Sequence, residues 1–142
     1  MLYVDTSAVV PFFVNEAASE DVRRWFSKQA LADIAISLWT TTEFASAMGI
    51  RTRTGTLDPA SAHGFVEAFR TLVRQSITLL PVTAADFEFA NELVLRFELG
   101  LRGGDALHLA IAGNAGADTI VTLDRKMREA VERLSWRCEI PG

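Results

Sequence analysis

The segment LYVDTS at residues 2–7 decides the fold of this chain. Its three apolar residues predict a short strand that ends at Asp5, and Thr6 opens a helical stretch that runs to Phe13. A carboxylate that directly follows an apolar strand lies where a parallel α/β sheet opens its crevice. The opening segment therefore predicts an α/β fold with an acidic side chain in that crevice.

Strands and helices alternate through the rest of the chain. The other apolar strands are expected at residues 34–36, 77–82, 119–123 and 136–138. The other helices are expected at about residues 18–30, 40–55, 58–75, 83–97, 105–115 and 125–134. Because most strands are continuously apolar, the pattern predicts a mainly parallel sheet buried between helices on both faces. The helices 40–55 and 58–75 have no strand between them, so we expect a helical hairpin that projects from the sheet.

Two local patterns make further predictions about the helices. Asp58 followed by Pro59 marks a helix start, because Asp caps a helix and Pro suits its first position. The helix over residues 83–97 is expected to bury one apolar stripe, formed by Phe87, Ala90, Val94 and Phe97.

Length and composition limit the class of protein. The chain has 142 residues, of which 49% are apolar, so residues 1–142 are expected to form a single domain with a sizeable core. No apolar run is long enough to span a bilayer, and no basic segment precedes the first strand as in a signal peptide. The lone Cys138 excludes an internal disulfide and a cysteine-based zinc site. These features predict a cytoplasmic protein without a membrane partner.

The charge balance neither predicts nor excludes a nucleic-acid partner. The net charge is −4, from 18 acidic and 14 basic side chains, which by itself argues against binding a polyanion. Four of the acids are candidate site residues, however, and without them the two signs balance. Twelve of the basic residues are Arg, whose planar guanidinium matches phosphate. Genome composition alone can also explain the preference for Arg.

Four acidic residues are distinguished by their positions: Asp5, Glu43, Asp105 and Asp124. Asp5 and Asp124 follow apolar strands, Glu43 lies one helical turn after a third strand, and Asp105 begins an apolar helix. Each also has a purely structural explanation, since the aspartates can cap helices and Glu43 can form a capping box with Thr40. As a set they are expected to converge in one crevice, where carboxylates repel one another unless they share a cation. A ligand set made only of oxygen atoms favours Mg²⁺ or Mn²⁺.

Neighbouring polar side chains carry weaker signals. The hydroxyl groups of Thr6, Ser7 and Thr122 lie beside the acids and could hold a bound water or a phosphate oxygen, although capping or packing is the simpler explanation. His108 lies one turn after Asp105 on the same helix face. A packed core histidine is the preferred interpretation, and the alternative is a histidine that orients Asp105.

Taken in order, these motifs resemble the PIN-domain family of nucleases, and within it the VapC toxins of bacterial toxin–antitoxin pairs. The matching pieces are LYVDTSA at residues 2–8, Glu43 in the third helix, GDALHLA at residues 104–110 and TLDRK at residues 122–126. The resemblance covers essentially the whole chain. It implies a PIN-like three-layer α/β/α fold and a metal-dependent endoribonuclease, usually a homodimer, that is silenced by a partner antitoxin.

The resemblance also implies roles for individual residues. It makes Asp5, Glu43, Asp105 and Asp124 the catalytic, metal-binding acids of a site that hydrolyses RNA phosphodiester bonds with Mg²⁺ or Mn²⁺. Thr6 and Thr122 are expected to help shape that site. From their positions near the crevice or on the hairpin, five basic residues are expected to contact RNA phosphates: Arg51, Arg53, Arg102, Arg125 and Lys126.

Three other interpretations fit parts of the sequence. An aspartyl-phosphate phosphatase needs a second Asp two residues after the first, where this chain has Ser7. A receiver domain pairs two acids near its first strand, and here Asp5 is alone. A catalytically silent PIN-fold module that binds an antitoxin or RNA is the stronger alternative, and metal-dependent cleavage distinguishes it from the enzyme.

Overall fold

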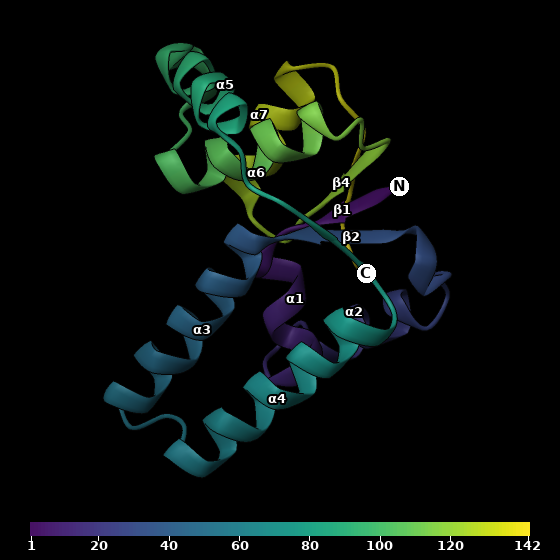
Figure 1. Ribbon diagram of the computed structural model, residues 1–142, viewed down its shortest axis with the longest axis vertical. Coiled ribbons are helices and arrows are strands. Elements are labelled where there is room, and N and C mark those ends of the chain that lie inside the picture. Colours follow the sequence, from purple (N-terminus) through teal and green to yellow (C-terminus); the bar gives the residue numbers. More distant parts are fainter.

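A five-stranded parallel sheet forms the centre of the molecule. The computed structural model describes residues 1–142, and Figure 1 shows the sheet between two groups of helices. Its order is β3-β2-β1-β4-β5, and every neighbouring pair is parallel. The α/β class and the parallel sheet predicted from the sequence are therefore confirmed. The strands are β1 (Leu2–Val4), β2 (Ile34–Ser37), β3 (Thr78–Leu80), β4 (Thr119–Val121) and β5 (Cys138–Glu139).

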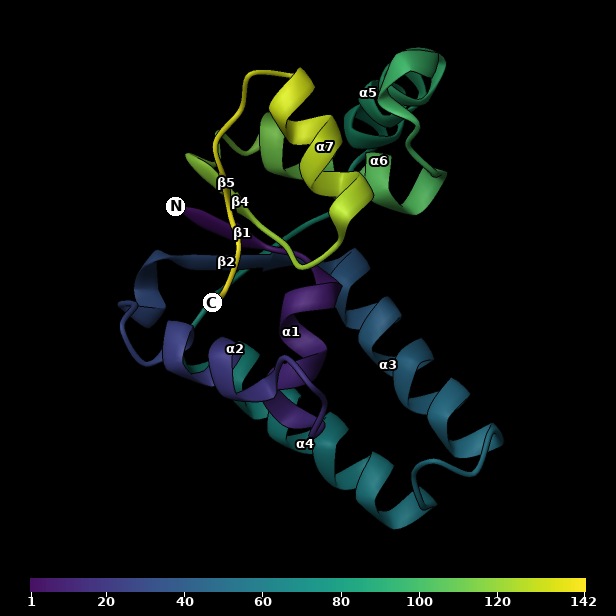
Figure 2. The same cartoon turned by 180° about the vertical axis from the view of Figure 1, so that it is seen from behind.

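Seven α-helices cover the two faces of the sheet. They are α1 (Thr6–Phe13), α2 (Ser19–Phe26), α3 (Leu38–Arg53), α4 (Pro59–Gln75), α5 (Ala84–Leu95), α6 (Gly103–Asn114) and α7 (Arg125–Arg133). Helices α1 to α4 lie on one side of the sheet and α5 to α7 on the other, as the two opposite views in Figure 1 and Figure 2 show. None of these helices combines the length and apolar character that a membrane span requires.

The two faces of the sheet have separate hydrophobic cores, and the short strand β1 contributes to both. Tyr3 belongs to the cluster that includes Leu109 and Met127, whereas Val4 belongs to the cluster that includes Phe44. Tyr3 and Val4 are both fully buried. Successive side chains of a strand point to opposite faces, so this central strand anchors both helical layers.

Helices α3 and α4 form the predicted hairpin, which extends beyond the sheet in Figure 1. Ser37 caps α3, because its Oγ accepts a hydrogen bond from the backbone N of Thr40 at 3.2 Å. Asp58 caps α4 as predicted. Between the two helices the rings of Phe44 and Phe69 stack with their centroids 4.3 Å apart. Phe13 of α1 packs against both rings, so the hairpin has defined helix starts and is joined to the core on its side of the sheet.

The apolar stripe predicted over residues 83–97 is only partly correct. Ala90 is buried, but the side chains of Phe87 and Phe97 are 54% and 82% exposed. Helix α5 ends at Leu95, and Phe97 begins a separate 3₁₀ turn, η2 (Phe97–Leu99), so the helical periodicity does not extend to it. Leu93 takes the buried position on α5 instead.

Candidate functional site

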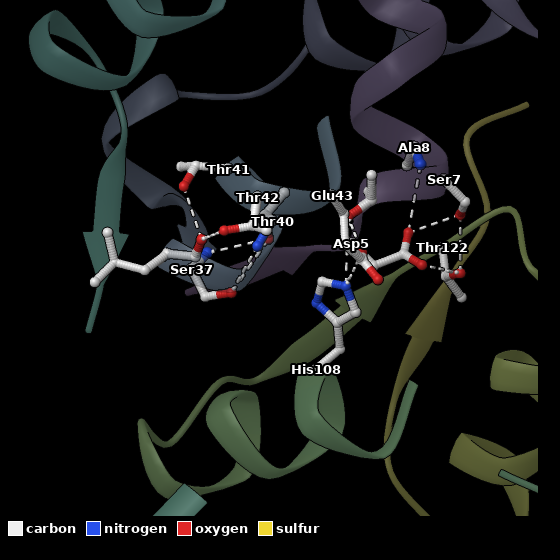
Figure 3. A network of polar contacts seen from close by, with 12 residues as sticks. Asp5, Ser7, Ala8, Ser37, Thr40, Thr41, Thr42, Glu43, His108 and Thr122 are labelled. Atoms are coloured by element: carbon white, nitrogen blue, oxygen red, sulfur yellow. Dashed lines mark hydrogen bonds and ion pairs between the residues drawn. The ribbon is translucent and has the colours of Figure 1, made fainter. Parts of the chain in front are cut away.

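The candidate site lies where the carboxyl ends of three adjacent strands meet. Strand β1 lies between β2 and β4, so Asp5, the residue after β1, lies between the ends of its neighbours. Its Oδ1 accepts a hydrogen bond from Ser7 Oγ at 2.7 Å, and its Oδ2 accepts one from Thr122 Oγ1 at 3.1 Å. Figure 3 shows the Asp5 carboxylate between these two hydroxyls on one side and Glu43 and His108 on the other.

Burial makes the charge of Asp5 energetically costly. The residue is only 3% exposed. Burial raises the pKa of the Asp5 carboxyl to about 6, although nearby His108 and the hydrogen bonds from Ser7 and Thr122 lower it in part. A buried carboxylate with a raised pKa gains most from a positively charged partner.

Glu43 is held by two side chains from other elements. Thr6 Oγ1 donates a hydrogen bond to Glu43 Oε2, and Nε2 of His108 lies 2.7 Å from the same oxygen. Burial opposes ionisation of Glu43, but its interactions with His108 and Thr6 outweigh burial and lower its pKa. The predicted capping box of Thr40 and Glu43 is wrong, because α3 begins directly after Ser37 and Thr40 pairs with that residue.

Asp105 and Asp124 lie at the starts of α6 and α7. Asp124 caps α7 and accepts a hydrogen bond from the backbone N of Met127 at 2.9 Å. Asp105 is not a cap, because α6 begins earlier, at Gly103. Burial raises the pKa of Asp105, and the negative charges of Asp124 and Glu43 raise it further. Its carboxylate therefore lies within the electrostatic field of two other acids.

One hydrophilic pocket joins three of the four acids. Its volume is about 420 Å³, and it is lined by Glu43, Arg102, Gly104, Asp105, Asp124 and Lys126. Asp5 is not part of this lining, but the hydroxyl of Thr122 connects it to Asp124, which is. Thr122 Oγ1 donates to Asp5 and accepts a hydrogen bond from the backbone N of Asp124 at 2.9 Å.

The chemistry of these side chains fits a hard divalent cation. No three His, Cys, Asp or Glu side chains of the chain are close enough together to form a ready-made metal cluster. Three carboxylates nevertheless line the same pocket, and the charges of Asp124 and Glu43 both raise the pKa of Asp105. Mg²⁺ takes oxygen ligands and keeps several waters, so it suits a polar pocket with spaced carboxylates better than a compact nitrogen or sulfur site.

The five predicted RNA-contacting residues lie in different surroundings. Arg102 and Lys126 line the pocket with the acids. Arg51 forms an ion pair with Glu16. Arg53 lines a separate groove between α3 and α4. Arg125 is exposed, and its Nε lies 3.8 Å from Glu129.

The sequence suggested the wrong partner for His108 and offered no sign of a role for Tyr3. His108 contacts Glu43 and not Asp105, so neither of its two predicted roles describes it fully. It is buried, with 2% exposure, and its Nδ1 lies 2.8 Å from the hydroxyl of Tyr3. Tyr3 reads as an ordinary strand residue in the sequence. Only the packing of α6 against the sheet reveals the contact, because the two residues are 105 positions apart in the sequence.

Comparison with protein-family models shows the family to which the chain belongs. The model of the PIN domain matches residues 2–132, so the chain belongs to the PIN-domain family. This confirms the resemblance seen in the sequence motifs. No curated protein matches the sequence significantly.

Solved structures with the same fold include several from toxin–antitoxin systems. VapC20 of Mycobacterium tuberculosis, described as a sarcin–ricin loop cleaving toxin, is 20% identical with a TM-score of 0.73, covering 92% of this chain and 95% of its own. DNA-bound VapBC of Salmonella typhimurium is 17% identical with a TM-score of 0.70, covering 99% and 98%. A toxin–antitoxin complex from Klebsiella pneumoniae is 18% identical with a TM-score of 0.62, covering 87% of each chain. The similarity extends over almost the whole fold.

Proposed function

We propose that this chain is a divalent-cation-dependent endoribonuclease and the toxin of a toxin–antitoxin pair. The observation that carries the proposal is the hydrophilic pocket in which Glu43, Asp105 and Asp124 face two basic side chains. Membership of the PIN-domain family and the similarity to an RNA-cleaving toxin structure support the same activity.

In this proposal Asp5, Glu43, Asp105 and Asp124 hold Mg²⁺ or Mn²⁺. The bound cation would supply the positive charge that phosphodiester hydrolysis requires at the scissile phosphate. Ionised Asp5 would gain a positive partner for a charge that burial otherwise disfavours. Two hydroxyls orient the acids, because Thr6 donates to Glu43 and Thr122 donates to Asp5.

RNA would bind through its phosphates. Arg102 and Lys126 support this best, since both line the acidic pocket and can neutralise a phosphate beside it. Arg125 adjoins Lys126 in the chain and is proposed as a further contact. Arg51 and Arg53, near the end of α3, would contact only a longer segment of RNA.

No protein nucleophile is required. Ser7 is the hydroxyl beside the buried acid, but it donates to Asp5 and accepts a hydrogen bond from the backbone N of Leu123 at 2.8 Å. It therefore serves as a link between α1 and the end of β4. Water activated in the acidic pocket is the proposed nucleophile.

The proposed partners are an antitoxin and a second copy of the chain, in the cytoplasm. The similar structures from Salmonella typhimurium and Klebsiella pneumoniae are complexes of toxin–antitoxin type, which supports an antitoxin partner. Leu95 and Phe97 are 66% and 82% exposed, and apolar side chains of this size favour a protein contact. Light scattering of the purified chain tests the homodimer.

The activity is tested with purified protein, free of any partner, and total RNA. Reactions contain Mg²⁺, Mn²⁺ or a chelator, and Asp105→Asn serves as the site variant. We expect discrete cleavage products that require the cation and are absent with the variant. Cation binding without cleavage of any RNA would instead favour the silent binding module, in which the fold and the acids serve recognition alone.

A further inference from the structure

A chain of hydrogen bonds runs from the core to one of the four acids. The hydroxyl of Tyr3 is hydrogen-bonded to Ser37 Oγ at 2.9 Å and to His108 Nδ1 at 2.8 Å. The other ring nitrogen, Nε2, lies 2.7 Å from Glu43 Oε2. Tyr3, Ser37 and His108 are almost completely buried. The series of hydrogen bonds runs from β1 and β2 through α6 to Glu43 on α3.

The chemistry of the groups determines what His108 does to Glu43. An ionised carboxylate only accepts hydrogen bonds, so Nε2 must carry the proton and donate it to Oε2. Because Tyr3 binds Nδ1, the imidazole ring is held at both nitrogens and its orientation is fixed. This arrangement matches the way in which outer residues orient metal ligands in proteins.

The two oxygens of Glu43 have different surroundings. Oε2 accepts hydrogen bonds from Thr6 Oγ1 and His108 Nε2, whereas Oε1 has no partner at normal hydrogen-bond distance. The Trp39 side chain also interacts with this carboxylate and lowers its pKa. Oε1 lies on the side of Gly104, where a methyl group built on that glycine would be 3.3 Å away. The same methyl position is 3.6 Å from Trp39 Nε1, a buried donor with no partner at normal hydrogen-bond distance. Oε1 is thus the oxygen of Glu43 left available at the pocket.

We infer that Tyr3 and His108 are positioning residues that hold the Glu43 carboxylate through Oε2 and leave Oε1 as its single ligand atom for the divalent cation. The inference rests on the proposed cation site. It assigns the two residues no contact with RNA, since both are buried beneath the acids.

The test measures binding of Mn²⁺ alone by calorimetry, with chelator-stripped protein at pH 7.5. His108→Leu removes the donor, whereas His108→Gln retains an N–H near the position of Nε2. Tyr3→Phe removes only the hydroxyl that holds the ring. Ile111→Val, a buried change on the same helix, is the control for loosened packing.

We expect His108→Leu to weaken Mn²⁺ binding roughly 10- to 100-fold, as loss of an outer partner typically does. His108→Gln should recover most of this loss, Tyr3→Phe should be intermediate, and Ile111→Val should bind as the unchanged protein does. Equal affinity in the Leu and Gln variants overturns the inference, whether both bind normally or both bind weakly. Absence of Mn²⁺ binding by the unchanged protein would contradict the proposed cation site itself, which separates the two failures.

Discussion

The four acids fall into two halves that differ in how they are held. Asp5 and Glu43 are fixed by side chains from other elements, including Thr122 and His108, which donate hydrogen bonds to their oxygens. Asp105 and Asp124 line the open pocket, where Asp124 is held only by a backbone N–H of its own helix and no side chain donates to the carboxylate of Asp105. The fixed half can define where a cation binds, and the open half can adjust to the cation and its RNA phosphate. Only the half that contains Asp5 and Glu43 is thus held in place by side chains of other elements before a cation binds.

The largest expected effect is the loss of catalysis. It should be equally large for a substitution in either half of the site. Asp5→Asn and Asp105→Asn should each lower RNA cleavage by at least about a thousandfold, because several kcal/mol of charge stabilisation is lost. Initial rates with a labelled RNA and Mg²⁺ measure the effect. Circular dichroism checks that both variants fold. Cleavage at the normal rate by either variant would remove that residue from the site.

A second test uses the pH dependence of stability to separate the halves. Burial raises the pKa of Asp5 from 3.8 to about 6, so the folded state binds this proton more tightly than the unfolded state does. Stability of the cation-free protein should therefore fall as pH rises from about 4 to 6 and stay lower at pH 7. Asp5→Asn removes this loss and should stabilise the cation-free protein at pH 7 by on the order of 3 kcal/mol.

The matched control for this test is Asp124→Asn, which keeps a capping side chain on α7. It should change stability at pH 7 much less than Asp5→Asn does, because it removes only the repulsion between Asp124 and Asp105. Urea denaturation in chelator at pH 4 and pH 7 gives both free energies of unfolding. A stability gain for Asp5→Asn that is as large at pH 4 as at pH 7 would contradict the role assigned to the buried charge.

A third test adds one methyl group beside Glu43 in the fixed half and compares it with a methyl group at the neighbouring glycine. Gly104→Ala places a carbon 3.3 Å from Glu43 Oε1, whereas a methyl group at Gly103 has no neighbour within 4 Å. Both changes favour helix formation similarly, so they differ mainly in their effect on Glu43. We expect Gly104→Ala to weaken Mn²⁺ binding by about tenfold and Gly103→Ala to leave it unchanged. Equal affinities in the two variants would show that Oε1 is not a ligand atom.

The smallest effect is expected at the basic side chains of the open half. Arg102→Ala and Lys126→Ala should each weaken binding of single-stranded RNA several-fold and reduce the slope of log affinity against log salt by about 0.7. The RNA-binding assay uses Asp105→Asn protein to prevent cleavage. Arg24→Ala is the comparison, since Arg24 lies on α2 outside the pocket and is paired with Glu20 and Asp21. Identical slopes in all variants would exclude Arg102 and Lys126 as phosphate contacts.

The sequence predicted much of the fold because its signals are local. Apolar strands, the Asp58-Pro59 helix start and the alternation of elements all depend on adjacent residues. The exposed Phe97 was predicted wrongly because the chain leaves the helix after Leu95. At Arg96 the backbone leaves the helical conformation, with φ −78° and ψ 79°, and the spacing of apolar residues does not reveal that change.

The candidate site was predictable only in part for the same reason. The acids could be named because they follow strands or begin helices. The hydrogen bonds of Glu43 could not be predicted, since Thr6, His108 and Glu43 are brought together only by the arrangement of β1, α3 and α6. The sequence instead suggested a local partner, Thr40, which pairs with the helix cap.

One measurement tests the central claim most directly: titration of the chelator-stripped protein with Mn²⁺, compared between the unchanged chain, Asp105→Asn and Asp58→Asn. Asp58 is an exposed helix cap outside the pocket, so its variant controls for loss of one negative charge. The account predicts saturable Mn²⁺ binding that Asp105→Asn weakens at least tenfold and Asp58→Asn leaves unchanged. Equal affinity in all three proteins, or no binding by the unchanged chain, would contradict a cation site built from these carboxylates.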